Sequence, residues 1–210
     1  MASFHPDADL LLRYSAGTCG AALQLAISSH LALCNECAYA VQRLDAISGM
    51  AISEAQPTLV SKKCLQQIFD RCKTPVTAQP AAQVTDTYPA PLSGLISQNP
   101  LKWESRGKDI QQAILLKEQS GTVAYMMKIR KGAEIPEHNH RGDEFVLILE
   151  GSMIDQRGAT LRGDFVTTDA AFTHKPRAGD DADCVCLVVA TGGVKFTKGL
   201  LRVLNVLPWQ

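Results

Sequence analysis

A histidine and two cysteines lie close together near the start of the chain, in the stretch HLALCNEC at residues 30–37. On a helix, offsets of four and seven residues from the histidine would place all three side chains on one face. Imidazole and thiolate groups are the ligands that structural zinc prefers, and a tetrahedral site needs four of them. The other histidine in the first half of the chain is His5. We therefore interpret His5, His30, Cys34 and Cys37 as one closed zinc site.

Two simpler interpretations of the cysteines compete with this site. Free cysteine is among the most buried residue types, so Cys34 and Cys37 would also suit core packing. A Cys-x-x-Cys pair can equally be a redox couple. The histidine at a helical offset and the second histidine upstream favour metal binding over both interpretations. A metal count on the purified protein tests the metal-binding interpretation.

A second group of candidate ligands lies between two glycines, in the stretch GAEIPEHNHRGDEFVLILEG at residues 132–151. His138 and His140 are two residues apart, so on a strand they point to the same side. Glu144 follows after a turn, and His174 follows a second glycine-led strand. Three imidazoles and one carboxylate suit zinc, iron, manganese or nickel. The alternative is a metal-free domain in which these histidines are only packed.

The first ligand group requires helices to hold it. Asp7 is a suitable N-cap for a short helix that Gly17 ends. A longer helix is expected from about Ala21 to about Ile47, because apolar residues and candidate ligands recur there in steps of three and four. The ligands would then face neighbouring helices, where bound zinc stabilises a module too small to bury a large core.

A third helix is expected from Thr58 to Cys72, with Cys64 and Cys72 as packing residues. Beyond it, the composition changes to alanine, threonine and glutamine with four prolines, at Pro75, Pro80, Pro89 and Pro91. Because proline disrupts helix interiors and central strands, this stretch is expected to be exposed. We predict a helical domain at residues 1–75, a linker at 76–93 and a second domain at 94–210.

The second domain shows the alternation of β-strands from about Leu101 onward. Short runs bounded by glycine-containing turns occupy residues 112–116, 123–129, 144–149, 164–167 and 183–190. This pattern predicts an antiparallel barrel or sandwich. In the last run, Cys184 and Cys186 would face one side of a strand. Neighbouring thiols near a metal could be oxidised, but core packing is the interpretation that we prefer.

Composition excludes several classes of function. The chain has 21 basic and 21 acidic residues, so its charge gives no general signal for polyanion or membrane-surface binding. We expect no direct nucleic-acid contact. No stretch approaches the roughly 20 apolar residues that span a bilayer, and the start of the chain does not look like a signal peptide. Seven cysteines, an odd count, fit ligands and core thiols better than a disulfide framework, so we expect a soluble, cytoplasmic protein.

Family resemblance rests on particular stretches of the sequence. Gly132, His138, His140, Glu144 and Gly151 have the spacing of the first cupin motif. The second motif matches less well, because an aspartate and an alanine, at positions 169 and 171, stand where proline and glycine are usual. Together with HPDADLLLRYSAG and SHLALCNEC in the first half, the segment HNHRGDEFVLILEGSMIDQRG makes nearly the whole chain resemble the ChrR family of zinc-binding anti-sigma factors.

This resemblance implies a multidomain α plus β protein, with an N-terminal helical bundle and a C-terminal antiparallel β-barrel of cupin type. In that family the helical domain inhibits an extracytoplasmic-function sigma factor, and the cupin domain links release to singlet oxygen or related oxidants. It implies no catalysis, zinc in the N-terminal site, and zinc or another divalent transition metal in the cupin site. The corresponding ligands would be His5, His30, Cys34, Cys37, His138, His140, Glu144 and His174. The rival interpretation is a cupin dioxygenase or isomerase with an accessory zinc module.

Overall fold

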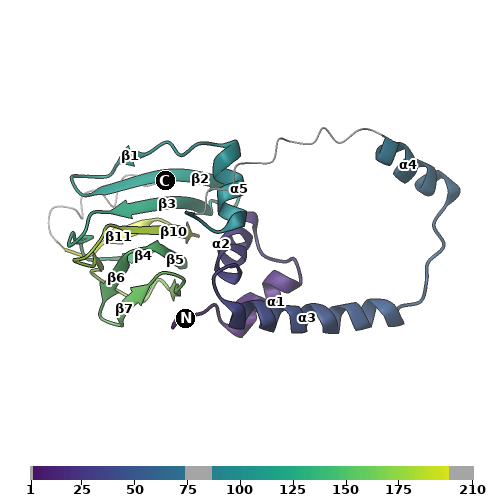
Figure 1. The fold of residues 1–210 in the computed structure, drawn as a ribbon, viewed down its shortest axis with the longest axis horizontal. Helices are drawn as coiled ribbons and strands as arrows, with labels where there is room; N and C mark the ends of the chain where they lie inside the picture. The colour runs from purple at the N-terminus through teal and green to yellow at the C-terminus, as the bar shows by residue number, and fades with distance from the viewer. Residues whose placement is uncertain (1, 74–86, 199–210) are drawn as a thin grey trace.

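The computed structural model describes residues 2–73 and 87–198. Its helices come first in the chain and its strands second, and α2 and α5 lie against one side of the strands (Figure 1). The predicted α plus β architecture is therefore confirmed. Within the described residues, none of the helices is long and apolar enough to cross a bilayer.

The first helix begins where the sequence provides a helix-start signal, and the next two differ from the prediction. In α1 (Ala8–Ser15), the Asp7 carboxylate accepts a hydrogen bond from the Leu10 amide at 2.8 Å, and Gly17 follows the helix end with a φ of +67°. The helix expected from 21 to 47 is instead two helices, α2 (Ala21–Leu31) and α3 (Asn35–Glu54). They separate because Cys34 has an extended backbone, and α3 leaves α2 in a new direction (Figure 1).

The two remaining helices differ from expectation in other ways. In α4 (Lys62–Lys73) no residue is buried, and Cys64 and Cys72 are exposed, so the prediction that these cysteines pack in a core is wrong. Helix α5 (Ala90–Gln98) overlaps the predicted linker. Pro89 is its N-cap residue and Pro91 lies in its first turn, where proline is tolerated because the first amides of a helix lack helical partners. Residues 74–86 lie outside the described part, and the linker remains a prediction.

The strands form three antiparallel sheets within the described residues, without closing into one hydrogen-bonded barrel. The six-stranded sheet has the order β1-β2-β3-β10-β5-β8, a three-stranded sheet has the order β7-β6-β9, and β4 pairs with β11. Their bounds are β1 (Glu104–Ser105), β2 (Ile110–Lys117), β3 (Val123–Ile129), β4 (His138–His140), β5 (Glu144–Glu150), β6 (Ser152–Asp155), β7 (Gly158–Leu161), β8 (Phe165–Thr168), β9 (Arg177–Ala178), β10 (Cys184–Ala190) and β11 (Val194–Phe196). All five predicted runs contain strands.

One apolar core joins the helices to the large sheet. It contains buried residues of α1, α2, α3 and α5 together with side chains from one face of β3, β5 and β10. The opposite face of β10 enters a second core, which includes Cys184 and Cys186. Alternate residues of β10 therefore serve different cores, as a period of two requires. Both thiols are fully buried, which supports packing as their role.

Candidate metal centres

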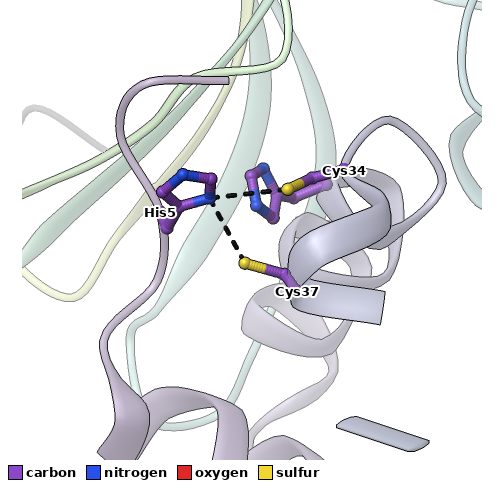
Figure 2. A group of neighbouring side chains, drawn as sticks. His5, Cys34 and Cys37 are labelled. Atoms are coloured by element: carbon purple, nitrogen blue, oxygen red, sulfur yellow. Dashed lines mark hydrogen bonds between the residues drawn. The ribbon is translucent and has the colours of Figure 1, made fainter. Parts of the chain in front are cut away.

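The four N-terminal candidate ligands converge as predicted. Their ligand atoms all lie within 4.8 Å of one another. Nδ1 of His5 is 3.4 Å from the sulfur of Cys34 and 3.4 Å from the sulfur of Cys37. Figure 2 shows the His5 imidazole, on the extended segment before α1, facing both sulfur atoms. The cluster therefore ties the start of the chain to α3 and, through His30, to α2.

The break between α2 and α3 is what allows this convergence. On one straight helix, His30 and Cys37 would be about 10 Å apart along the axis, because each residue adds about 1.5 Å. That separation is too long for ligands of a single ion. In the structure His30 is in the last turn of α2, Cys34 is the residue before α3, and Cys37 is in the first turn of α3. The spacing correctly predicted the cluster, but the continuous helix was wrong.

His30 has the state that a metal ligand requires. Its Nδ1 is 2.8 Å from the carbonyl oxygen of Gly163, which can only accept, so Nδ1 carries the proton. Its Nε2 then carries a lone pair and can only accept a hydrogen bond or bind a metal. This buried atom has no hydrogen-bond partner among the described residues. An unpartnered buried acceptor facing two thiols and an imidazole fits a bound metal ion. Burial also lowers the pKa of His30, which keeps the ring neutral.

The two thiols favour a metal over a redox-active pair. Burial, reinforced by the nearby Cys34, raises the pKa of Cys37 to about 12, so without a cation this thiol stays protonated and unreactive. A metal ion reverses that preference by binding the thiolate. Glu36, whose carboxylate lies 3.8 Å from Nε2 of His5, is placed to orient the His5 ring from the solvent side.

The second cluster brings three histidines together from separate strands and loops. His138 and His140 lie at the two ends of β4, and His174 forms an isolated antiparallel bridge with His138. Nε2 of His174 is 3.1 Å from Nε2 of His138 and 3.1 Å from Nε2 of His140. All three rings are almost completely buried. Three Nε2 atoms directed at one point are the arrangement of a metal site rather than of ordinary packing.

Hydrogen bonds on the far side of the rings fix two of these orientations. Nδ1 of His138 donates to the Pro136 carbonyl oxygen at 2.7 Å, and Nδ1 of His174 lies 3.4 Å from a carboxylate oxygen of Asp155. Burial opposes ionisation of Asp155, but hydrogen bonds from Arg157 outweigh it and hold the pKa of that carboxyl below its usual range. Asp155 was not predicted from the sequence, although its place in a short run between the two histidine motifs, where β6 ends, was a usable signal.

Burial keeps the histidines of this cluster neutral, as metal binding requires. It lowers the pKa of His140 to about 3 and that of His174 to about 4, with further contributions from neighbouring charges. Glu144 lies at the start of β5, with a carboxylate oxygen 3.4 Å from Nε2 of His140. Burial raises the pKa of Glu144 to about 7. The converging group itself consists of the three histidines, and a ligand role for Glu144 remains a prediction.

The histidine cluster opens onto a cavity of about 770 Å³ inside the strand domain. His138, His174 and Glu144 line the cavity beside a mostly apolar wall that includes Tyr125, Met127, Ile148, Met153 and Val166. A small molecule could therefore approach the cluster. Thr168 and Arg157 also line this cavity, and Arg157 donates a hydrogen bond to the Thr168 hydroxyl at 3.2 Å.

Comparison with known proteins agrees with both halves of this description. Residues 93–194 match the family described as the ChrR cupin-like domain. The protein is thus of a class that joins a helical domain with a His/Cys cluster to a cupin-like domain. The chain is 30% identical over 204 residues to the anti-sigma-E factor ChrR of Cereibacter sphaeroides, covering 96% of this chain and 95% of the relative. It belongs to the ChrR family of anti-sigma factors.

The structural comparison points the same way. The crystal structure of Rhodobacter sphaeroides SigE in complex with the anti-sigma ChrR contains a chain that matches with a TM-score of 0.76 and 30% identity, over 90% of this chain and 99% of that chain. Anti-sigma factors are regulators that act by binding. Family membership therefore confirms the predicted regulator and does not support the rival interpretation as a dioxygenase or isomerase.

Proposed function

We propose that this protein binds and inhibits an extracytoplasmic-function sigma factor, and that the apolar face of α4 is one of its main contacts. Helix α4 has no buried residue, although its polar and apolar residues are segregated. The segment leading into it and the helix itself expose five large apolar residues: Leu59, Val60, Leu65, Ile68 and Phe69. An amphipathic helix whose apolar face has no partner within the described chain is typical of a protein-interaction surface.

The second half of α3 carries further exposed apolar residues. Ile47, Met50 and Ile52 are each more than 60% exposed. In Figure 1, α3 projects beyond the other helices, and α4 stands apart from them at the end of a connecting segment. Two separated helices with exposed apolar residues could contact a partner from more than one side. Such an interface would reach the roughly 1,000 Å² or more that stable complexes bury.

The test is binding of the sigma factor from the same host to the full chain. Phe69→Asp should raise the dissociation constant at least about tenfold, because a charge replaces an apolar contact. Gln67→Asp is the matched control. It also introduces an aspartate into the interior of α4, but on the polar face, where Gln67 is exposed. Equal affinities for Phe69→Asp and the unchanged chain would contradict the proposal.

Zinc in the N-terminal site is part of the same proposal. Two thiols and two imidazoles are a preferred zinc ligand set. Bound zinc would supply a link that holds the His5 segment against α2 and α3. His5, His30, Cys34 and Cys37 would thereby fix the direction in which α3 leaves the body of the protein.

Release would be controlled from the cupin-like domain, in response to singlet oxygen or a related oxidant. The histidine cluster and its cavity support this assignment because a small molecule or oxidant can reach the cluster. His138, His140, Glu144 and His174 would hold zinc or another divalent transition metal there. In a sigma-dependent reporter strain, His140→Ala should still repress but respond less to singlet oxygen. Unchanged induction by this variant would place the sensor elsewhere in the chain.

A further inference from the structure

Helix α2, which carries His30, is held at both ends by the cupin-like domain. At its start, Gly20 offers no side-chain cap, and the Glu118 carboxylate between β2 and β3 accepts a hydrogen bond from the Ala22 amide at 2.8 Å. At its end, His30 donates to the Gly163 carbonyl between β7 and β8. The position and ring orientation of His30 therefore depend on residues more than 80 positions away in sequence.

The segment that carries His5 is fixed by the same β7–β8 turn. One carboxylate oxygen of Asp164 accepts hydrogen bonds from the Ser3 amide at 2.5 Å and the Phe4 amide at 3.1 Å. The Phe165 amide donates to the Phe4 carbonyl at 2.9 Å. Asp164 is only 2% exposed, so the acceptor of these bonds is buried. Two of the four candidate ligands thus take their positions from residues 163–165.

We propose that Asp164 is a positioning residue for the N-terminal metal site, which is completed across the boundary between the two domains. This inference rests on the proposed metal binding by His5, His30, Cys34 and Cys37. Groups that orient the ligands typically contribute about 10- to 100-fold to metal affinity. Asp164 acts through the amides of Ser3 and Phe4, the two residues before His5, and so determines where the imidazole of His5 lies relative to the two thiols.

The same strand extends from this turn to the other histidine cluster. Phe165 begins β8 beside the His30 ring, with ring centroids 5.6 Å apart. Thr168 ends β8, pairs with Glu144 of β5 and accepts a hydrogen bond from Arg157. Arg157 in turn holds Asp155, which contacts His174. One four-residue strand therefore contacts the surroundings of both clusters.

A purely local role for Asp164 is the competing explanation. Its second carboxylate oxygen accepts a hydrogen bond from the Leu161 amide at 2.7 Å and so also closes the β7–β8 turn. A local role would affect the stability of the cupin-like domain without changing metal affinity in molecules that remain folded. The two explanations therefore differ in a property that belongs to the N-terminal site alone.

Cobalt binding to the full chain provides that measurement. Co²⁺ bound to thiolates gives a sulfur-to-metal charge-transfer absorption, which a site of histidines and carboxylates does not give. Titrating Co²⁺ against a competing chelator then reports on Cys34 and Cys37 only. Asp164→Ala should weaken Co²⁺ affinity at the thiolate site at least about tenfold. Asp164→Asn, which keeps one acceptor oxygen, should lose less.

Two further variants complete the design. Asp183→Ala is the control, since Asp183 also accepts a backbone hydrogen bond within the cupin-like domain, from Lys131 at 3.0 Å, and forms its ion pair with Lys128 rather than with the N-terminal segment. It should bind Co²⁺ like the unchanged chain. Ser3→Pro removes one donor to Asp164 without altering the cupin-like domain, and should weaken binding a few-fold even if Asp164→Ala proves unable to fold.

The possible outcomes separate this inference from the proposed function. Wild-type Co²⁺ affinity in both Ser3→Pro and the folded Asp164 variants would overturn the positioning role while leaving the N-terminal metal site intact. An unchanged chain that shows no thiolate-to-cobalt absorption would overturn both. Weaker binding in the Asp164 and Ser3 variants, with Asp183→Ala unaffected, would support the cross-domain site.

Discussion

The two histidine clusters bring their ligands together by different means. In the N-terminal cluster, His5 comes from an extended segment and the other three ligand residues come from the adjoining ends of α2 and α3. In the cupin-like cluster, strand pairing places the rings, as the bridge between His138 and His174 shows. The first cluster contains two thiols, and the second lines a cavity.

This difference indicates different tasks. Thiolates at helix ends bind zinc tightly and connect elements that would otherwise separate. Imidazoles at the wall of an apolar cavity can hold a metal while leaving room for another molecule. We therefore expect the first site to maintain the shape that binds a partner and the second to respond to small molecules. The following experiments test that division.

The largest effect is expected from removing a thiolate. Cys37→Ser should lose the N-terminal metal. It should also bind the sigma factor at least about 100-fold more weakly, because the His5 segment is then no longer tied to α3. His140→Ala should lose the other metal but keep its affinity for the sigma factor. Metal analysis and binding measurements on the same preparations check both expectations. Normal sigma binding by the metal-depleted Cys37→Ser protein would contradict the division of tasks.

Acidification should lower the metal affinity of the N-terminal cluster more steeply than that of the cupin-like cluster. Two thiols must lose protons to bind a metal, so N-terminal affinity should fall about 100-fold per pH unit between about pH 7 and about pH 6. His140 and His174, with pKa values of about 3 and about 4, are already neutral in that range and release no protons. Glu144, with a pKa of about 7, would cost at most about tenfold per unit if it is a ligand. Competition titrations at several pH values measure both slopes, and equal slopes would show that thiols do not ligate.

The smallest effect concerns the cysteines themselves. An alkylating reagent should modify the exposed Cys64 and Cys72 in the native protein and spare the buried Cys184 and Cys186. Adding a strong chelator should make Cys34 and Cys37 a few-fold more reactive, because the His5 segment is then no longer tied to α2 and α3 and solvent reaches the two thiols. Peptide mass spectrometry resolves each site. Modification of Cys186 at the rate of Cys64 would instead support an oxidant-sensing role for the β10 thiols.

Much of both clusters was predictable because their ligands are rare residue types at characteristic spacings. All five histidines of the chain lie in the two clusters, and the spacing around His138 is short enough to specify a turn between two consecutive strands. The glycine-bounded runs predicted the strands for the same reason. Local patterns sufficed wherever the partners were close in sequence.

The features that were missed depend on contacts distant in sequence or on geometry. The break before Cys34 follows from the need to bring ligands around one point, which periodicity alone does not express. Gly163 and Asp164 approach His30 and Phe4 only after folding. Asp155, at the end of β6, contacts His174, which lies between β8 and β9, only after folding. The third predicted helix, α4, was expected to pack, but none of its residues is buried in the part of the chain that the structure describes.

The uncovered apolar face of α4 also bears on how long the protein survives in a cell. Exposed apolar segments are recognised by chaperones and proteases, and they promote self-association. A molecule whose α4 is covered by a partner should therefore outlast one that is alone. Synthesis in excess of the partner would then be corrected by degradation, so the steady-state amount of this protein would follow that of its partner without any dedicated control of its expression.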